Sequence, residues 1–288
     1  MKTFQLLIVA ALLLLTGTSH RSDNFCFLVV SDSHYGKSDR QKNLETINRM
    51  NNLEGSRLPG FLAGRAGKPL GVIHCGDILD QPSDSAFREF EEDYGLTGEA
   101  LLSYPVYETF GNHDGGISQV VRQAIIRRNP GRPGLARISD NGLHYSWDWN
   151  GVHFINLGAY PGNEWIDSCG WCHYFKDPFR EPLFSRDFLK NDLRLSVGSS
   201  GRPVVLIQHY GWDDFSLLWW TSPDRDSLAE VLRPYRVAAI FHGHSHAVEH
   251  RTWKDIPVWS AGSTVKGEEP GNILYISYRN GRIRVWPI

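Results

Sequence analysis

Five short apolar segments, each ending abruptly in polar residues, constrain the fold of this chain more than any other feature. They are the segments FCFLVVSDSH, LGVIHCGDILD, VYETFGNHDGG, PVVLIQHY and VAAIFHGHSH. Runs this short and this rich in Val, Ile and Phe are typical of buried β-strands. Helical patterns lie between them, at residues 39–50, 118–128, 186–195 and 225–235. The alternation predicts an α/β fold in which helices separate the buried strands.

Two further segments predict β-hairpins. Residues 143–157 and 273–286 have Asn-Gly at their centres, at Asn150–Gly151 and Asn280–Gly281. A two-residue hairpin turn of this kind needs positive φ at both central residues, which Asn and Gly tolerate best. Hairpins together with helix-separated strands indicate mixed sheets that pack against each other and are covered by helices.

The first residues have the three parts of a secretory signal. Lys2 supplies the positive start, residues 6–15 are apolar, and the small residues of TGTS offer a cleavage site. The apolar run is short for a bilayer span, so we predict a cleaved signal at 1–19 rather than an anchor. We expect a single domain over residues 24–288, secreted or periplasmic, with no stable membrane anchor.

The four cysteines do not define a disulfide framework. Cys169 and Cys172 form CGWC, which is consistent with a small loop disulfide or with two free thiols. A redox-active pair is a third interpretation, but the flanking sequence lacks the strand-then-helix context of a thioredoxin-like site. Cys26 and Cys75 lie in apolar runs and are expected in the core.

The polar residues that follow the apolar runs are candidate metal ligands. In chain order they are Asp32, His34, Asp77, Asn112, His113, Asp114, His209, His244 and His246. Singly, a His after a strand is usually a hydrogen-bonded structural residue, and Gly-Asp is usually a turn. Together they occupy the strand ends where α/β sheets bind ligands. Carboxylate, amide and imidazole donors suit a pair of divalent metals better than a Cys-based structural zinc.

In this order, the blocks DSH, GDILD, GNHD, QHY and GHSH resemble the signature of the calcineurin-like metallophosphoesterases. The resemblance implies a four-layer αββα sandwich of two mixed β-sheets flanked by helices, with a dinuclear metal site at the strand carboxyl ends. By position, Asp32, His34 and His246 would hold one metal ion, Asn112, His209 and His244 the other, and Asp77 would bridge them. Gly243 and Ser245 are small enough to let the backbone approach the ions.

The same resemblance implies a metal-dependent phosphoesterase acting on a phosphate mono- or diester. Two metals neutralise the phosphoryl oxygens, and the expected nucleophile is a metal-bridging hydroxide. His113 is the expected general acid, with Asp114 or a nearby carboxylate orienting its ring. Asp80 is expected to support its loop and not to bind metal.

The metals are expected to be divalent Mn, Zn or Fe. Purple acid phosphatases, within the wider superfamily, have a Tyr where this chain has Asp80, so stable ferric iron is not expected here. The alternative function is a catalytically inactive binding protein with the metallophosphoesterase fold. Such scaffolds typically lose ligands or the acid, whereas every expected position is present in this chain.

The substrate is expected to be a small phosphate ester, with an aromatic, nucleoside or lipid moiety. The net charge is −2 and no basic stripe is visible, so a nucleic-acid polymer is not an expected partner. Trp165 and Trp212 are candidates to stack on the organic group, and Tyr35 is a candidate pocket residue. Trp219 and Trp220 either line the pocket or pack a helix onto the sheet.

Two histidines near the last block are not expected to bind metal. His242 lies in the final part of its strand and His250 lies beyond the loop. Buried polar groups generally find hydrogen-bond partners, so both are interpreted as structural or supporting residues.

Overall fold

The computed structural model describes residues 24–37, 40–60, 64–114, 119–163, 182–265 and 272–288. The predicted signal at 1–19 lies outside these residues, as do Trp165, Cys169 and Cys172. Among the described segments, no helix combines the length and the apolarity that crossing a bilayer requires.

The described strands form two mixed sheets. The five-stranded sheet has the order β12 (Arg282–Pro287), β11 (Leu274–Arg279), β1 (Phe25–Val30), β2 (Val72–His74) and β3 (Val106–Glu108). Strands β1, β2 and β3 are parallel, whereas β11 runs antiparallel to β1 and β12 antiparallel to β11. The parallel strands therefore end at one edge of the sheet, where the loops with polar residues begin.

The seven-stranded sheet has the order β4 (Leu135–Ile138), β5 (Tyr145–Trp149), β6 (Val152–Asn156), β7 (Val204–Ile207), β8 (Val237–His242), β10 (Ile256–Ser260) and β9 (Glu249–Trp253). Its centre, from β6 through β10, is parallel, and the outer strands β4, β5 and β9 are antiparallel. Parallel strands that are buried on both faces usually have continuous apolar sequences, and β7 and β8 have such sequences.

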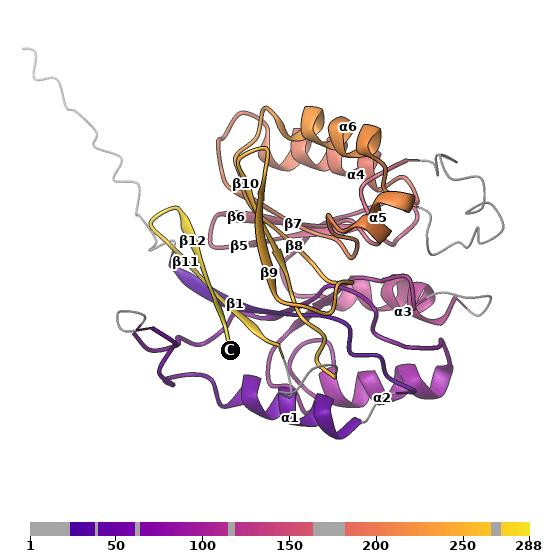
Figure 1. Cartoon of the computed structure of the whole chain (residues 1–288), viewed down its shortest axis with the longest axis vertical. Coiled ribbons are helices and arrows are strands. Elements are labelled where there is room, and N and C mark those ends of the chain that lie inside the picture. Colours follow the sequence, from indigo (N-terminus) through magenta and orange to yellow (C-terminus); the bar gives the residue numbers. More distant parts are fainter. Residues whose placement is uncertain (1–23, 38–39, 61–63, 115–118, 164–181, 266–271) are drawn as a thin grey trace, which may run out of the picture.

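Helices cover the outer faces of both sheets (Figure 1). The described α-helices are α1 (Arg40–Asn51), α2 (Asp84–Tyr94), α3 (Val120–Arg128), α4 (Ser185–Asp192), α5 (Asp214–Trp219) and α6 (Ser222–Leu232). A 3₁₀ turn follows α3 at Asn129–Gly131, and a π turn extends α4 over Leu193–Val197. Helices α1 and α2 lie outside the five-stranded sheet, and α4 and α6 lie outside the other sheet (Figure 1). This arrangement confirms the predicted αββα layers.

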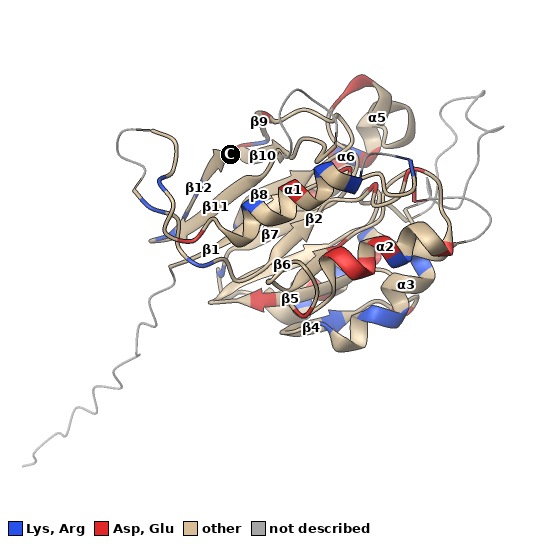
Figure 2. Ribbon diagram, turned by 90° about the horizontal axis from the view of Figure 1, so that it is seen from below, with Lys and Arg blue, Asp and Glu red and all other residues tan. Residues whose placement is uncertain are grey.

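Helix α2 was missed by the sequence analysis, although local signals for it exist. Ser83 caps its first turn, because its side chain accepts a hydrogen bond from the Ala86 N–H at 3.2 Å. Phe87, Phe90 and Tyr94 then form a buried apolar face at helical spacing. The basic end of α3 pairs with acidic α2 (Figure 2), through contacts of Arg127 and Arg128 with Glu91.

Aromatic side chains hold the two sheets face to face. Phe27 of β1 contacts Phe154 of β6 and Phe241 of β8, with ring centroids 5.3 and 5.8 Å apart. Both contacts are edge-to-face, an arrangement that aromatic quadrupoles favour. Cys26 and Cys75 are buried free thiols, as predicted. The shared core makes a stiff platform for the loops at the strand ends.

Both predicted hairpin turns are present. Asn150 and Gly151 have φ of 44° and 84° between β5 and β6, and Asn280 and Gly281 have φ of 50° and 75° between β11 and β12. Positive φ at both central residues is the geometry that the Asn-Gly pairs predicted.

Candidate metal centre

The polar residues predicted as ligands converge where five parallel strands end. Asp32 and His34 follow β1, Asp77 follows β2, Asn112 follows β3, His209 follows β7, and His244 and His246 follow β8. The loops within each sheet are joined by their backbones: the Asp32 N–H donates to Gly76 O at 3.0 Å, and the Gly243 N–H donates to His209 O at 3.1 Å. Between the sheets, the His244 N–H donates to Asp32 Oδ2 at 3.1 Å. Loops from both sheets therefore form one connected structure.

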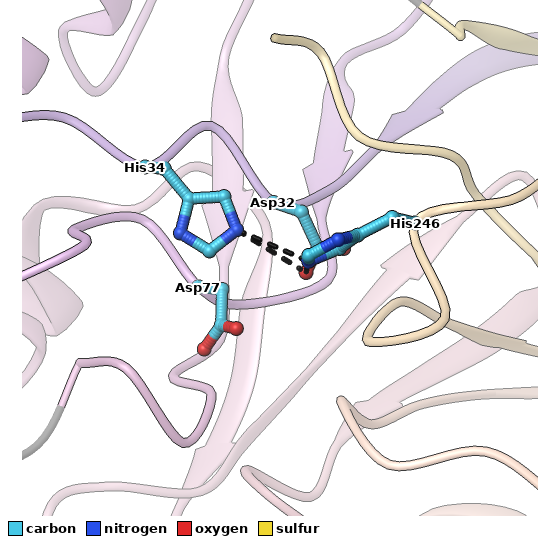
Figure 3. Close-up of side chains that lie close together, drawn as sticks. All are labelled: Asp32, His34, Asp77 and His246. Atoms are coloured by element: carbon cyan, nitrogen blue, oxygen red, sulfur yellow. Dashed lines mark hydrogen bonds and ion pairs between the residues drawn. The ribbon is translucent and has the colours of Figure 1, made fainter. Parts of the chain in front are cut away.

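The first cluster consists of Asp32, His34, Asp77 and His246, whose potential ligand atoms all lie within 4.8 Å of one another. Figure 3 shows the side chains of Asp32, His34 and His246 directed toward one another. His246 Nε2 lies 3.2 Å from Asp32 Oδ1 and 3.2 Å from His34 Nε2. His34 Nε2 lies 3.9 Å from the same carboxylate oxygen. Two imidazole nitrogens and a carboxylate oxygen thus face a common point.

The second cluster consists of Asp77, His209 and His244. His209 Nδ1 lies 2.8 Å from Cys75 O and can only donate to that carbonyl, which leaves Nε2 directed elsewhere. His209 Nε2 lies 3.4 Å from Asp77 Oδ2 and 3.0 Å from Asn112 Oδ1. Asp77 belongs to both clusters, so its carboxylate lies between the two groups of donor atoms.

The donor atoms of both clusters fit divalent metals. Asp32 Oδ1 and Asp77 Oδ2 are buried without a regular hydrogen bond among the described residues, although His246 Nε2 lies 3.2 Å from the first and His209 Nε2 lies 3.4 Å from the second. A buried carboxylate oxygen without a partner is costly, and a bound cation would remove that cost. Oxygen and imidazole donors, with Asn112 Oδ1 beside them, are the ligands that Mn, Zn and Fe accept.

The protonation states of the site follow from burial and from mutual charge. Burial would raise the pKa of Asp77, but the positive charge of His209 holds it below its ordinary value. Burial would lower the pKa of His209, and the Asp77 carboxylate instead raises it to about 9. Burial and the charge of His209 lower the pKa of His244 to about 4, so that ring is neutral at pH 7. Neutral imidazole is the form that binds metal.

Five of the predicted ligands adopt the left-handed backbone conformation. Their φ angles are 55° at Asp32, 45° at His34, 51° at Asp77, 73° at His244 and 58° at His246. Non-glycine residues rarely adopt positive φ, and such strain concentrates at functional sites. The tertiary contacts of the loops therefore maintain a costly backbone geometry that turns these side chains toward one another.

Two glycines make room for the carboxylates. A Cβ on Gly243 would overlap the Ser31 hydroxyl and lie 2.7 Å from Asp32 Oδ2, to which the next residue, His244, donates its backbone N–H at 3.1 Å. A Cβ on Gly111 would overlap Asp77 Oδ1. The predicted approach of the Gly243 backbone to a metal ion stays a prediction.

His113 forms a third cluster with His34 and Asp80, whose potential ligand atoms also lie within 4.8 Å of one another, and 40% of the His113 side chain is exposed. Its Nδ1 lies 3.1 Å from the backbone oxygen of Asp80 and 3.9 Å from the Asp80 carboxylate. The Asp80 carboxylate also lies 3.7 Å from His34 Nδ1 and 3.3 Å from Lys37 Nζ. Asp80 is therefore the carboxylate beside the His113 ring, a role that the sequence analysis did not assign to it.

The structure corrects the role suggested for Asp114. Its buried carboxylate accepts hydrogen bonds from the backbone N–H groups of Gly111 at 2.7 Å, Leu79 at 2.8 Å and Ile78 at 3.1 Å. These bonds tie the loop after β2 to the loop after β3. Because its two oxygens are engaged by the backbone, Asp114 supports the site and does not orient the His113 ring.

The structure also corrects the suggestion that Tyr35 lines the pocket. Tyr35 is buried, and its hydroxyl donates to Asp93 Oδ2 at 2.8 Å. His242 is also buried, and its Nδ1 lies 2.9 Å from Gly243 O. Neither Tyr35 nor His242 belongs to a metal-ligand cluster among the described residues. The exposed His250 ring stacks on Trp259 with centroids 4.1 Å apart, so both His242 and His250 have structural surroundings.

The tryptophans around α5 pack mainly against protein. Trp219 and Trp220 are buried, in agreement with the interpretation that they pack a helix onto the sheet. Trp212 is partly buried, with ring centroids 4.8 Å from Trp220 and 5.1 Å from Trp253. Much of the Trp212 ring is therefore already covered by aromatic neighbours.

Comparisons with known proteins agree with this fold. The sequence profile of the calcineurin-like phosphoesterases matches residues 26–248, whereas no curated protein matches the chain. A dimetal phosphatase from Danio rerio is 14% identical with a TM-score of 0.57, covering 91% of this chain and 98% of its own. The anchor in the inner membrane complex of Plasmodium is 14% identical with a TM-score of 0.55, covering 91% and 83%. At 14% sequence identity, these structural similarities show a shared fold and nothing more.

Proposed function

This chain belongs to the family of calcineurin-like phosphoesterases, and we propose that it is an active metal-dependent hydrolase of phosphate mono- or diesters. The observation that carries the proposal is the position of Asp77, which is shared by two clusters of Asp and His side chains. A site that only supported the fold would not need two sets of converging donors around one carboxylate.

We propose that the site holds two divalent ions. Asp32, His34 and His246 would hold one ion, Asn112, His209 and His244 the other, and Asp77 would contact both. When bound, the two ions neutralise the phosphoryl oxygens and make water acidic enough to supply hydroxide near neutral pH. The neutral His244 ring and the ionised Asp77 are in the protonation states that metal binding needs, whereas His209, whose pKa is raised to about 9, would have to release a proton to bind.

His113 is the proposed proton donor to the leaving oxygen. Its ring lies outside both proposed ligand sets and is accessible to substrate, with its Nδ1 held by the backbone oxygen of Asp80. The opposite nitrogen, Nε2, is then the atom that can carry a proton to the ester. The Asp80 carboxylate also lies beside the ring, 3.9 Å from Nδ1.

The metals are proposed to be Mn, Zn or ferrous iron. Asp80 stands where purple acid phosphatases have a Tyr, and here its side chain faces His34, Lys37 and His113. Without a phenolate ligand at this position, we do not propose ferric iron.

The proposal is tested by metal reconstitution. The purified protein is stripped of metal, reloaded with Mn, and assayed on aryl phosphate and bis-aryl phosphate, with metal content measured in the same samples. We expect turnover of at least one ester, and EDTA should abolish it. If the fully reloaded protein hydrolyses neither ester, the catalytically inactive binding protein becomes the better description.

We also propose that the chain is exported and acts on small phosphate esters rather than on nucleic-acid polymers. The support is the signal-like pattern of residues 1–19 and the near-neutral net charge of −2. Sequencing the N-terminus of protein recovered outside the cytoplasm tests the export. An intact Met1 on that protein would contradict cleavage.

A further inference from the structure

Helix α5 brings an exposed aromatic side chain to the edge of the metal-binding residues. Phe215 is 43% exposed, and its ring centroid lies 5.1 Å from that of His244, with the two planes inclined by 31°. The buried ring of Tyr210 lies 4.8 Å from the His244 ring. The proposed ligand His244 is therefore in contact with one aromatic ring in the core and another that reaches solvent.

The position of Phe215 is fixed by contacts at both ends of α5. Asp213 caps the helix, accepting from the Ser216 N–H at 2.8 Å and from the Ser216 hydroxyl at 2.6 Å. One turn after Phe215, Trp219 is buried, and the two ring centroids are 6.4 Å apart. Trp219 and Phe215 thus form an apolar stripe that runs from the core to the surface beside His244. The contacts of α5 position Phe215 in the protein without a bound substrate.

We propose that Phe215 binds the organic group of the ester and favours a flat aromatic group without further negative charge. This inference rests on the proposed phosphoesterase function. An exposed aromatic face gains most from an aromatic partner, through buried apolar area and through ring contacts. Asp213 and Asp214, beside Phe215 at the start of α5, would repel an organic group that carries a second phosphate or a carboxylate.

Binding of two phosphonates measures this preference without turnover. Phenylphosphonate and methylphosphonate carry the same anionic head, and their carbon–phosphorus bond is not an ester. Calorimetric titration of the Mn-loaded protein should show that phenylphosphonate binds about 3- to 10-fold more tightly, the size expected of one aromatic contact. Phe215→Ala should remove this ratio, and Phe215→Tyr should retain it.

Leu217→Ala is the matched control, because Leu217 is on the same helix and is 38% exposed. It should leave the ratio at the wild-type value. A ratio that Phe215→Ala does not change, or that Leu217→Ala lowers equally, overturns the inference while leaving the hydrolase proposal in place. If the Mn-loaded protein binds neither phosphonate and hydrolyses neither test ester, the proposed function fails and the inference fails with it.

Discussion

The ring nitrogen Nδ1 of His113 lies 3.1 Å from the backbone oxygen of Asp80. A carbonyl can only accept a hydrogen bond, so this contact places a proton on Nδ1 and leaves Nε2 as the nitrogen available to a substrate. Nε2 is protonated only in the cationic ring. The geometry therefore fits a proton donor that is held by one loop and exposed at the edge of the proposed metal site.

Replacing His113 with Ala should slow catalysis without removing metal. A positioned general acid contributes about 10²–10⁴-fold, and the loss should be largest for alkyl esters, whose leaving groups need the proton most. Turnover of nitrophenyl and alkyl phosphates is compared at equal metal content, measured by elemental analysis. Loss of an ion from the variant would instead make His113 a ligand and contradict its role.

Replacing Asp80 with Asn should lower turnover by roughly tenfold, because Asp80 acts through the His113 ring rather than on the ester. The readout that separates this role from a general structural one is a double-mutant cycle. In the His113→Ala background, Asp80→Asn should lower turnover only slightly further. An additive loss would show that Asp80 acts elsewhere, and a fall in metal content would point to its contact with His34 instead.

Gly111→Ala should weaken metal binding. The new Cβ would overlap Asp77 Oδ1 and lie 2.8 Å from His209 Cε1, so the shared carboxylate has to move. Titration of the metal-free protein with Mn should show lower affinity in this variant. Gly131→Ala is the control, because its Cβ meets only the flexible end of Leu96 at 3.1 Å. Equal Mn affinity in both variants would contradict the tight fit around Asp77.

Glu108 should stabilise the fold except in strong acid. It is fully buried at the end of β3, where it contacts Arg128 Nε at 2.8 Å and the guanidinium of Arg132. Burial favours the neutral acid, but the two arginines hold the pKa of Glu108 at about 2, below its usual 4.5. A lowered pKa stabilises the folded state above pH 4.5, and that contribution is lost as the pH falls toward about 2.

Glu108→Gln tests this contribution. The variant should lose about 3 kcal/mol of unfolding free energy at pH 7, because two buried arginines lose their counter-charge. Denaturant unfolding at a series of pH values should show the difference from wild type narrowing as the pH falls below 4.5. Glu92→Gln, in an exposed pair with Arg40, should change stability little. A difference between wild type and Glu108→Gln that does not depend on pH would contradict the lowered pKa.

Much of the fold follows from patterns that are local in the sequence. Apolar runs of strand length and the Asn-Gly pairs at Asn150 and Asn280 depend on side-chain periodicity and on backbone preferences at single positions. The candidate ligands could also be found from local patterns. A polar residue directly after a buried strand lies at the end of that strand, whatever the position of the strand in the sheet. Helix α2 also had local signals, and its omission reflects an incomplete use of them.

The assignment of roles within the site required the tertiary structure. His34 and His246 are separated by 212 positions along the chain, yet their Nε2 atoms lie 3.2 Å apart. Asp114 adjoins His113 in sequence, but its carboxylate turns to the backbone of another loop, and Asp80 is the one beside the ring. Neighbouring residues in a turn point in different directions, so sequence adjacency does not determine which carboxylate meets which imidazole.

The sequence alone therefore determined that strands end in metal-binding residue types and which family the order of those residues resembles. Only the tertiary structure decided that Tyr35 is buried, that Phe215 is exposed beside His244, and that five of the proposed ligands adopt the left-handed backbone conformation. The reason is that residue type and periodicity are properties of one segment. Burial, side-chain direction and tolerated strain depend on how several distant loops pack against one another.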